Sequence, residues 1–286
     1  MPRPAPRGRM VDVAGRRLHL VAAGPPSGEP LVVLEAGSYG ASADWAAVQA
    51  LLTVGGVRSL AYDRAGLGLS DPGPSPRDGV AIAADLERLL AALGEAGPLV
   101  LVGHSMAGLH VRLFAGRNPA RIAGLVLVDA FTPEMAKDPR IAAGARGYGR
   151  LARLSAAATA LGLIRPFGPF GDSIGVEGEA HAHKLWTFGN AGHTRAAADE
   201  ILAWPFTAAQ ALAVGPADPA WPVAVVTASA ERRLPAFRAL QAAAASASAR
   251  GRVDHVAGAR HASLLGPRYA HHVVGGIEHV LKTLHA

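Results

Sequence analysis

The chain has 286 residues, of which half are hydrophobic and 17% are charged. This balance is typical of a globular protein with a large buried core and excludes a mainly disordered chain. The length suits one large domain, or a domain that carries a sizeable insertion. Because the sequence contains no cysteine, disulfides, thiolate catalysis and sulfur-ligated metal are excluded.

The net charge is +6, and most of the 28 basic residues are arginines. They are spread along the chain and never form a run of five or more, so we attribute the charge to an arginine-rich composition and not to nucleic-acid binding. A mildly positive surface would still attract anionic substrates.

Residues 1–10 are rich in proline and arginine and lack the apolar stretch of a secretory signal. No segment approaches the roughly 18 apolar residues of a transmembrane helix. We therefore expect a soluble, cytoplasmic protein without a membrane span; the sequence leaves its oligomeric state open.

In chain order, alternating hydrophobicity around a Gly-Arg turn predicts a β-hairpin over residues 11–22. Residues 31–34 form a short, wholly apolar run that ends in a glycine loop, as expected of a parallel strand buried on both faces. Helical and strand patterns then alternate, which predicts βαβ units. The predicted helices are 44–52, 80–93 and 106–116, and the predicted strands are 58–62, 99–102 and 124–128.

This alternation stops after Asp129. Residues 131–220 contain alanine-rich helical pieces, a Gly/Pro-rich segment at 166–171 and most of the aromatic residues, but no clear strand. The sheet pattern resumes with strands at 222–226 and 252–256, a helix at 235–245 and a last helix from 267. We predict an α/β core domain of residues 1–130 and 221–286, interrupted by a helical cap of residues 131–220.

The motif Gly103-His104-Ser105-Met106-Ala107-Gly108 follows an apolar strand and opens a helix. A nucleophilic serine needs this context, because it sits on a tight strand-to-helix turn that requires small residues two positions before and after it. Ser105 is our candidate nucleophile. His104, its neighbour, is expected to line the substrate pocket.

A serine hydroxyl needs a general base, and His261 is the candidate because it follows the last predicted strand in a loop. His181 and His183 could form a metal pair, but no third ligand cluster with suitable spacing accompanies them. We interpret them as solvated histidines of the cap, and we expect no metal and no cofactor.

An oxyanion hole needs two backbone N–H donors. Met106, directly after the nucleophile, is expected to supply one. The other is expected from Ser38, in the small-residue loop 35–40 after the strand at 31–34. Gly37 and Tyr39 in the same loop are the candidate substrate-binding residues beside it.

With these motifs in place, the chain resembles the α/β-hydrolase superfamily, in its branch of capped esterases, epoxide hydrolases and haloperoxidase-like enzymes. The resemblance covers roughly residues 31–129 and 222–286 and leaves the cap unmatched. Its carriers are the oxyanion-type glycine loop, the segments 62–70, 103–108 and 127–130, and the late His261. It implies an α/β-hydrolase fold with a mostly parallel eight-stranded sheet flanked by helices, and a structural, loop-ordering role for Asp63 and Arg64.

The chain departs from the family pattern at three places. Ala36 stands where a histidine is usual, which should leave the backbone donor intact. Arg260 replaces the usual glycine before the catalytic histidine, so its guanidinium either reaches the site and binds an anionic group or lies on the surface. The acid of the triad is also ambiguous. Glu231 has the usual position after the seventh strand, whereas Asp129 ends the sixth strand, where some dehalogenase-like members carry their acid.

The motifs favour a serine hydrolase that cleaves a small or medium carboxylic ester, or a lactone or thioester, through an acyl-enzyme. Epoxide and haloalkane hydrolysis are disfavoured because both normally need a carboxylate where Ser105 stands. The alternatives are carbon–carbon bond hydrolysis, cofactor-free perhydrolysis, and a non-catalytic ligand receptor on the same scaffold.

Overall fold

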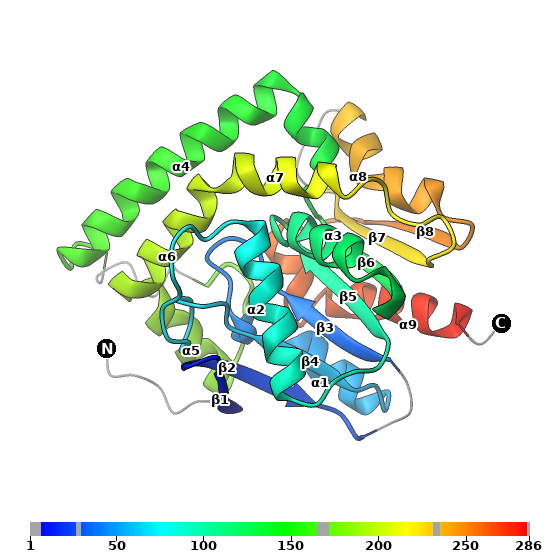
Figure 1. The fold of residues 1–286 in the computed structure, drawn as a ribbon, viewed down its shortest axis with the longest axis horizontal. Coiled ribbons are helices and arrows are strands. Elements are labelled where there is room, and N and C mark those ends of the chain that lie inside the picture. Colours follow the sequence, from blue (N-terminus) through cyan, green and yellow to red (C-terminus); the bar gives the residue numbers. More distant parts are fainter. Residues whose placement is uncertain (1–6, 27–29, 165–171, 231–234, 285–286) are drawn as a thin grey trace.

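A computed structural model describes residues 7–26, 30–164, 172–230 and 235–284. One eight-stranded sheet runs through the molecule in the order β1-β2-β4-β3-β5-β6-β7-β8 (Figure 1). Its strands are β1 (Arg9–Val13), β2 (Arg16–Ala23), β3 (Leu31–Glu35), β4 (Ser59–Tyr62), β5 (Leu99–His104), β6 (Ile122–Val128), β7 (Val223–Ala228) and β8 (Gly251–Val256).

The sheet is parallel from β4 through β8, and β2 pairs antiparallel with both β1 and β4. The hairpin β1-β2 turns at Ala14 and Gly15, both with positive φ, as a two-residue hairpin turn requires. The predicted mostly parallel eight-stranded sheet and its hairpin are therefore confirmed, with element boundaries displaced by a few residues.

Helices cover both faces of the sheet. On one face lie α1 (Ala46–Val54) and α9 (Ala270–Thr283), and on the other lie α2 (Gly79–Ala92), α3 (Ala107–Arg117) and α8 (Pro235–Ala247). Because side chains alternate along a strand, β5 sends Val100 and Val102 to the first face and Leu99 and Leu101 to the second. This double coverage explains why the central strands are continuous apolar runs.

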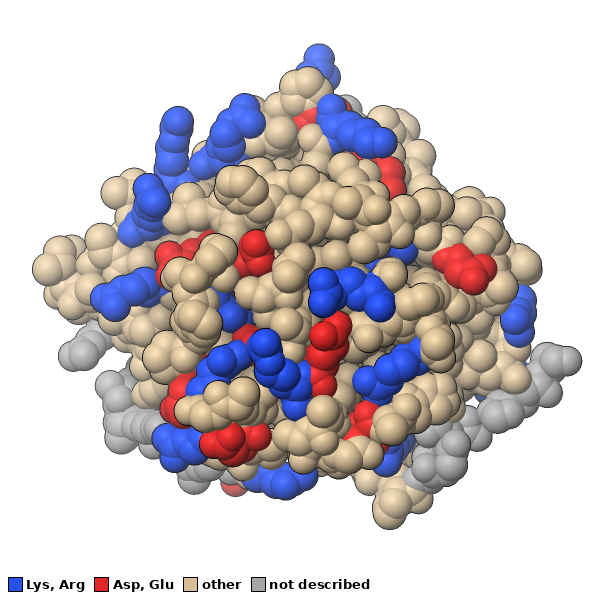
Figure 2. Space-filling model, viewed as in Figure 1, with Lys and Arg blue, Asp and Glu red and all other residues tan. Residues whose placement is uncertain are grey.

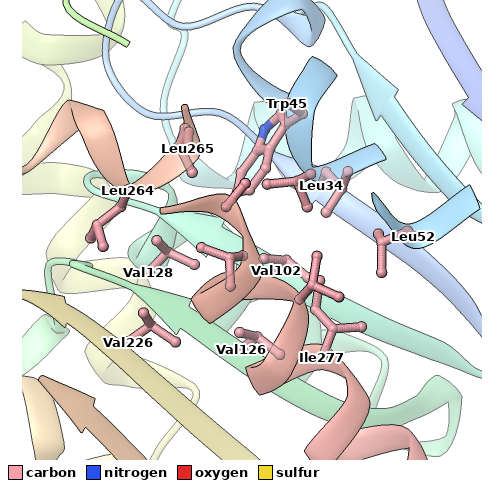
Figure 3. Close-up of a cluster of buried hydrophobic side chains, with 14 of the residues drawn as sticks. Leu34, Trp45, Leu52, Val102, Val126, Val128, Val226, Leu264, Leu265 and Ile277 are labelled. Carbon is pink, nitrogen blue, oxygen red and sulfur yellow. The ribbon is translucent and has the colours of Figure 1, made fainter. Parts of the chain in front are cut away.

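The hydrophobic core between the sheet and helices α1 and α9 holds the strand ends in place. Val102, Val126, Val128 and Val226 of three adjacent strands pack against Ile277 of α9 (Figure 3). Leu264 and Leu265 of the short 3₁₀ helix η5 (Ala262–Leu265) reach into the same cluster. The residue directly before η5, His261, is thereby held at a fixed place above the sheet.

Between β6 and β7 the chain leaves the sheet and forms helices over the carboxyl ends of the strands (Figure 1). They are the 3₁₀ helix η3 (Pro133–Lys137), α4 (Pro139–Ala160), α5 (Gly178–Phe188), α6 (Ala191–Leu202) and α7 (Trp204–Ala213). Within the described part of residues 131–220 there is no strand, as the sequence predicts. That this segment is a cap domain in its own right stays a prediction.

The contacts of these helices set the walls of the space beneath them. Helix α4 packs along α6, α7 packs on α3, and α5 packs on the 3₁₀ helix η1 (Ser42–Trp45). A second short 3₁₀ helix, η2 (Pro119–Arg121), precedes β6. Among the residues that the structure describes, no helix is both long and apolar enough to cross a membrane.

Candidate active site

Three strands end at one edge of the sheet and bring the candidate reacting groups together. Ser105 follows β5, Asp129 follows the adjacent β6, and His261 follows β8. In a parallel sheet the carboxyl ends of neighbouring strands meet at one edge, where such folds place their ligands. Residues separated by up to 156 positions in sequence thus become neighbours.

The turn that carries Ser105 is strained and tightly packed. Ser105 has φ of 57°, a left-handed conformation that is unfavourable for a residue with a side chain. A Cβ at Gly103 would lie 2.8 Å from Ala107 O, and one at Gly108 would lie 2.3 Å from Phe131 O. A glycine is therefore required at position 103, as the sequence predicts, and the structure adds the same requirement at position 108.

The imidazole of His261 bridges the serine and an aspartate. Its Nε2 lies 2.9 Å from Ser105 Oγ, and its Nδ1 lies 2.6 Å from Asp129 Oδ2. A carboxylate cannot donate a hydrogen bond, so this contact puts the ring proton on Nδ1 and leaves Nε2 free to accept the serine hydroxyl. Gln241 Nε2 of α8 donates to the other oxygen of Asp129 over 3.0 Å, which orients the buried carboxylate.

The loop after β3 runs against the serine. A Cβ at Gly37 would lie 2.8 Å from Ser105 Cβ, so a glycine is needed there. Within the described residues, no hydrogen bond occupies the backbone N–H of Ser38 or Met106, and Ser38 Oγ lies 3.5 Å from Met106 Sδ. The side chains of the two candidate residues are thus in contact, and no hydrogen bond among the described residues occupies their backbone N–H groups.

Arg64 holds this loop in place from beneath. Its buried guanidinium donates to Gly37 O over 3.0 Å and also to Ala36 O. Glu35 Oε1 lies 2.7 Å away, and Glu200 of α6 pairs with the same guanidinium at 2.8 Å. Burial would lower the pKa of Arg64, but the two carboxylates outweigh it and raise it. The loop-ordering role expected of Arg64 is confirmed, and it extends to the helices above the sheet.

The neighbouring Asp63 orders a second stretch of chain. It accepts hydrogen bonds from the backbone N–H groups of Ser42 at 2.7 Å and Leu69 at 2.8 Å, and it pairs with His19 Nδ1 at 2.9 Å. Burial opposes its ionisation, yet the contact with His19 and the nearby His183 hold its pKa below the usual range. The structural role expected for Asp63 is likewise confirmed.

A cavity of about 840 Å³ opens above Ser105. Every described residue assigned to the site from sequence lines it except Asp129, which lies behind His261 with its side chain fully buried. The remaining walls are mostly apolar and come chiefly from α4, α5, α6, α7, α8 and the segment after β6. Large apolar members are Phe131, Ile141, Leu151, Ile201, Trp204 and Phe237.

One charged pair interrupts the apolar lining. Lys184 Nζ of α5 donates to Asp44 Oδ1 of η1 over 2.7 Å, and both residues line the cavity. Both side chains are largely buried, so the pair is weakly screened by water. No local sequence signal marks this pair, because its members are 140 residues apart.

His104 lies beside His261 and contacts both its ring and its backbone. Its ring stacks on that of His261 with centroids 4.6 Å apart, and its Nε2 lies 3.2 Å from His261 O, so the Nε2–H donates to that carbonyl. Burial, with a further contribution from His261, lowers the pKa of His104 to about 3. The ring therefore stays neutral next to the base, and its expected position at the pocket wall is confirmed.

Two further sequence expectations are resolved by the structure. Arg260 is exposed and is absent from the cavity lining, which agrees with the surface interpretation. The interpretation of His183 as a solvated residue is wrong: it is buried, its ring packs edge-on against His19, and its Nε2 lies 3.6 Å from Asp63 Oδ2. His181 does remain partly exposed and pairs with Asp172.

The alternative acid, Glu231, lies outside the described residues. Within those residues, no three histidine or acidic side chains are arranged to hold a metal ion. Sequence reasoning missed Gln241 and the Lys184–Asp44 pair, and neither carries a motif that could have revealed it.

Comparisons with known proteins agree with this architecture. The family model described as the alpha/beta hydrolase fold matches residues 30–164. A putative carbamate hydrolase RutD of Variovorax paradoxus is 36% identical over 126 residues, which are 43% of this chain and 46% of that protein. The chain matches less than half the length of the first curated relatives.

Two solved structures superimpose over almost the whole chain. An esterase from Thermogutta terrifontis gives a TM-score of 0.71 at 21% identity and covers 97% of this chain and 99% of that one. A putative epoxide hydrolase from Pseudomonas aeruginosa gives 0.75 at 16% identity, with 96% of each chain covered. The chain therefore has the α/β-hydrolase fold, and its residues 30–164 match the family model of that fold.

Proposed function

We propose that this protein is a serine hydrolase that cleaves a carboxylic ester through an acyl-enzyme, with Ser105 as nucleophile, His261 as general base and Asp129 as the acid of the triad. The observation that carries the proposal is the continuous contact from Ser105 Oγ through the His261 ring to Asp129 Oδ2, at 2.9 Å and 2.6 Å. A serine used only as a helix cap would not need this alignment.

In the proposed reaction, Ser105 Oγ bonds to the carbonyl carbon while its proton moves to His261 Nε2. The carbonyl electron pair moves onto the oxygen, and the N–H groups of Ser38 and Met106 stabilise that charge. The intermediate collapses by breaking the bond to the alcohol oxygen, which takes the proton from His261. A water molecule, deprotonated by His261, then releases the acyl group as the acid.

Asp129 is favoured as the acid for two reasons. Its carboxylate is fully buried and contacts Nδ1 of the base directly. Gln241 holds its second oxygen, so the carboxylate has one orientation. In this position Asp129 keeps the proton of the neutral ring on Nδ1 and stabilises the imidazolium that forms during turnover.

The shape of the cavity favours an ester with a sizeable apolar part. Its volume of about 840 Å³ lies near the upper end of the range for small-molecule sites, about 300–1,000 Å³. Phe131 packs edge-on against both Trp204 and Phe237, which forms an aromatic wall on the β6 side of Ser105. Asp44 of the Lys184–Asp44 pair lies on η1, which follows β3, and β3 lies on the side of β5 opposite to β6.

The names of similar proteins are compatible with this proposal but do not choose among substrates, since they include an esterase, a carbamate hydrolase and epoxide hydrolases. Epoxide hydrolysis is the weaker candidate, because the nucleophile position carries a serine and not a carboxylate. A ligand receptor on the same scaffold is the alternative from another class, and it predicts binding without turnover.

The test is labelling and turnover in one preparation. An active-site fluorophosphonate should label the wild type at Ser105 and leave Ser105→Ala unlabelled. A panel of p-nitrophenyl esters of increasing acyl length should be hydrolysed by the wild type and not by Ser105→Ala. Absence of labelling together with absence of turnover across the panel would refute the proposal and favour a receptor.

A further inference from the structure

Helix α4 has an unusual charge distribution. Its 22 residues include no aspartate or glutamate, and they include Arg140, Arg146, Arg150 and Arg153. The last three recur at spacings of four and three, which places them on one side of a helix, and all three are exposed. None of these arginines appears in an ion pair within the described residues.

Beside the arginines runs a row of exposed leucines. Leu151, Leu154 and Leu161 are 62%, 68% and 76% exposed, and Leu163 follows directly after the helix at 60%. Spacings of three and seven keep the first three on one side, whereas the buried Gly149, Ala152 and Thr159 face the protein. Together with Tyr148, these leucines are half of the large hydrophobic side chains that are exposed among the described residues.

The leucine row reaches the cavity. Leu151 is exposed and also lines the cavity above Ser105, as do Tyr148 and Ser155 of the same helix. Going around α4, the surface therefore changes from cavity wall to exposed leucines and then to arginines. The helix lies along an outer edge of the molecule (Figure 1), where Lys and Arg side chains gather on the face seen in Figure 2.

Exposure of these leucines to water alone would be unusual, because soluble proteins rarely expose contiguous rows of large apolar side chains. A helix with exposed leucines next to arginines and without acidic residues has the composition of helices that lie in a lipid interface. The leucines would enter the acyl boundary, and the long arginine side chains would reach the phosphates. The positive charge selects an anionic surface.

We propose that the arginine and leucine rows of α4 dock the protein on an anionic phospholipid surface. Docking places the edge of the cavity that contains Leu151 against the lipid, where an apolar ester is concentrated. The docking surface is separate from the Ser105 site, so it is tested by binding without turnover.

The test uses the full chain with Ser105→Ala, so that hydrolysis plays no part. Binding to phosphatidylcholine vesicles is compared with binding to vesicles that also contain phosphatidylglycerol, by flotation at low and moderate salt. We expect binding to the anionic vesicles that weakens as salt rises, and little binding to the neutral ones. Equal affinity for both vesicles, or no binding to either, would overturn the proposal.

Two sets of variants locate the surface. Arg146, Arg150 and Arg153 changed together to Gln should weaken binding on the order of 100-fold, since each basic residue contributes roughly a fivefold factor. The charge-matched control changes Arg88, Arg117 and Arg252, which are exposed outside α4, and should change binding far less. Equal losses in both sets would show that net charge alone acts and would overturn the assignment to α4.

The apolar row is tested with Leu154→Ser and Leu161→Ser together, neither of which lines the cavity. This change should weaken binding at least tenfold, whereas Val54→Ser, exposed on α1, should not. Slower amide hydrogen exchange of residues 139–160 on vesicles gives the same information without substitution. A dimer in solution that the leucine variant converts to a monomer would overturn the proposal and assign the face to a second copy.

Discussion

The cavity has a floor and a roof that are built in different ways. The floor consists of residues that follow strand ends, such as Ser105 and His261, and Asp129 lies directly behind it at the end of β6. The roof consists of α4 to α7, which are placed by pairings between distant parts of the chain, such as Lys184 with Asp44. In the proposed hydrolase, the sheet therefore positions the reacting groups, whereas the helices shape the space for the substrate.

The largest loss of activity is expected from a substitution at the floor of the cavity. Asp129→Asn keeps the shape of the side chain but removes the charge that stabilises the imidazolium, so kcat should fall by about 10⁴-fold. Glu231→Gln is the matched control and should lower kcat by less than about tenfold. Steady-state kinetics on one p-nitrophenyl ester measure both, and the reverse order would assign the acid to Glu231.

Two buried, neutral histidines, one in the floor and one in the roof, should make the stability of the protein depend on pH. Burial lowers the pKa of His104 and of His193, which links α6 to the loop at Tyr39, to about 3 from 6.5. Their unfolded forms take up protons below pH 6.5 and the folded forms do not, so stability falls as the pH drops. The free energy of unfolding should decrease by roughly 4 kcal/mol between pH 7 and 5.

Urea denaturation at several pH values measures this decrease. In His193→Gln the pH dependence should shrink by about half, because one of the two groups no longer titrates. An unchanged slope in that variant would show that the protons bind elsewhere.

A smaller effect is expected from the loop between the two regions. Gly37→Ala puts a methyl group 2.8 Å from Ser105 Cβ, so the loop must move and the Ser38 donor with it. Loss of one oxyanion donor costs about 10²–10³ in kcat. Gly55→Ala, where an added Cβ would make contacts no closer than 3.5 Å, is the matched control and should keep nearly full activity.

The smallest change in kinetics is expected from a substitution in the roof of the cavity. Lys184→Met removes the cationic group from the cavity and should raise KM about tenfold for a p-nitrophenyl monoester of a dicarboxylic acid. KM for the alkanoyl ester of the same length should change little. Lys282→Met, at an exposed lysine of α9, controls for net charge; an equal rise of KM for both esters would mean that the change disturbed the fold.

The difference between floor and roof also explains what could be predicted from sequence. Ser105 and the candidate oxyanion donors were found because strand, turn and helix follow one another within a few residues. The choice between Asp129 and Glu231 stayed open because both follow strands, and the local pattern does not give the direction of the side chain. Asp129 also has a positive φ of 44°, which no sequence signal predicts.

The contacts of the roof helices could not be predicted from local sequence patterns. The helical content of residues 131–220 was predicted, but nothing near His183 shows that it packs on His19 from the first hairpin. In the same way, the exposure of the leucines on α4 follows from which side packs on α6 and not from their spacing alone. Such features depend on tertiary contacts between segments that are well separated in sequence, in some cases by more than 100 residues.

The buried guanidinium of Arg64 has a consequence for how a ligand reaches the cavity. It ties α6 to the loop after β3, and lifting α6 would break the buried Arg64–Glu200 ion pair, which costs several kcal/mol when one partner of such a pair is removed. We therefore expect α6 to stay closed during turnover and entry to occur at the edge formed by α4. A hinge that opened at α6 would also release the loop at Ala36 and Gly37, so in the proposed hydrolase the entrance lies away from the Ser105 site.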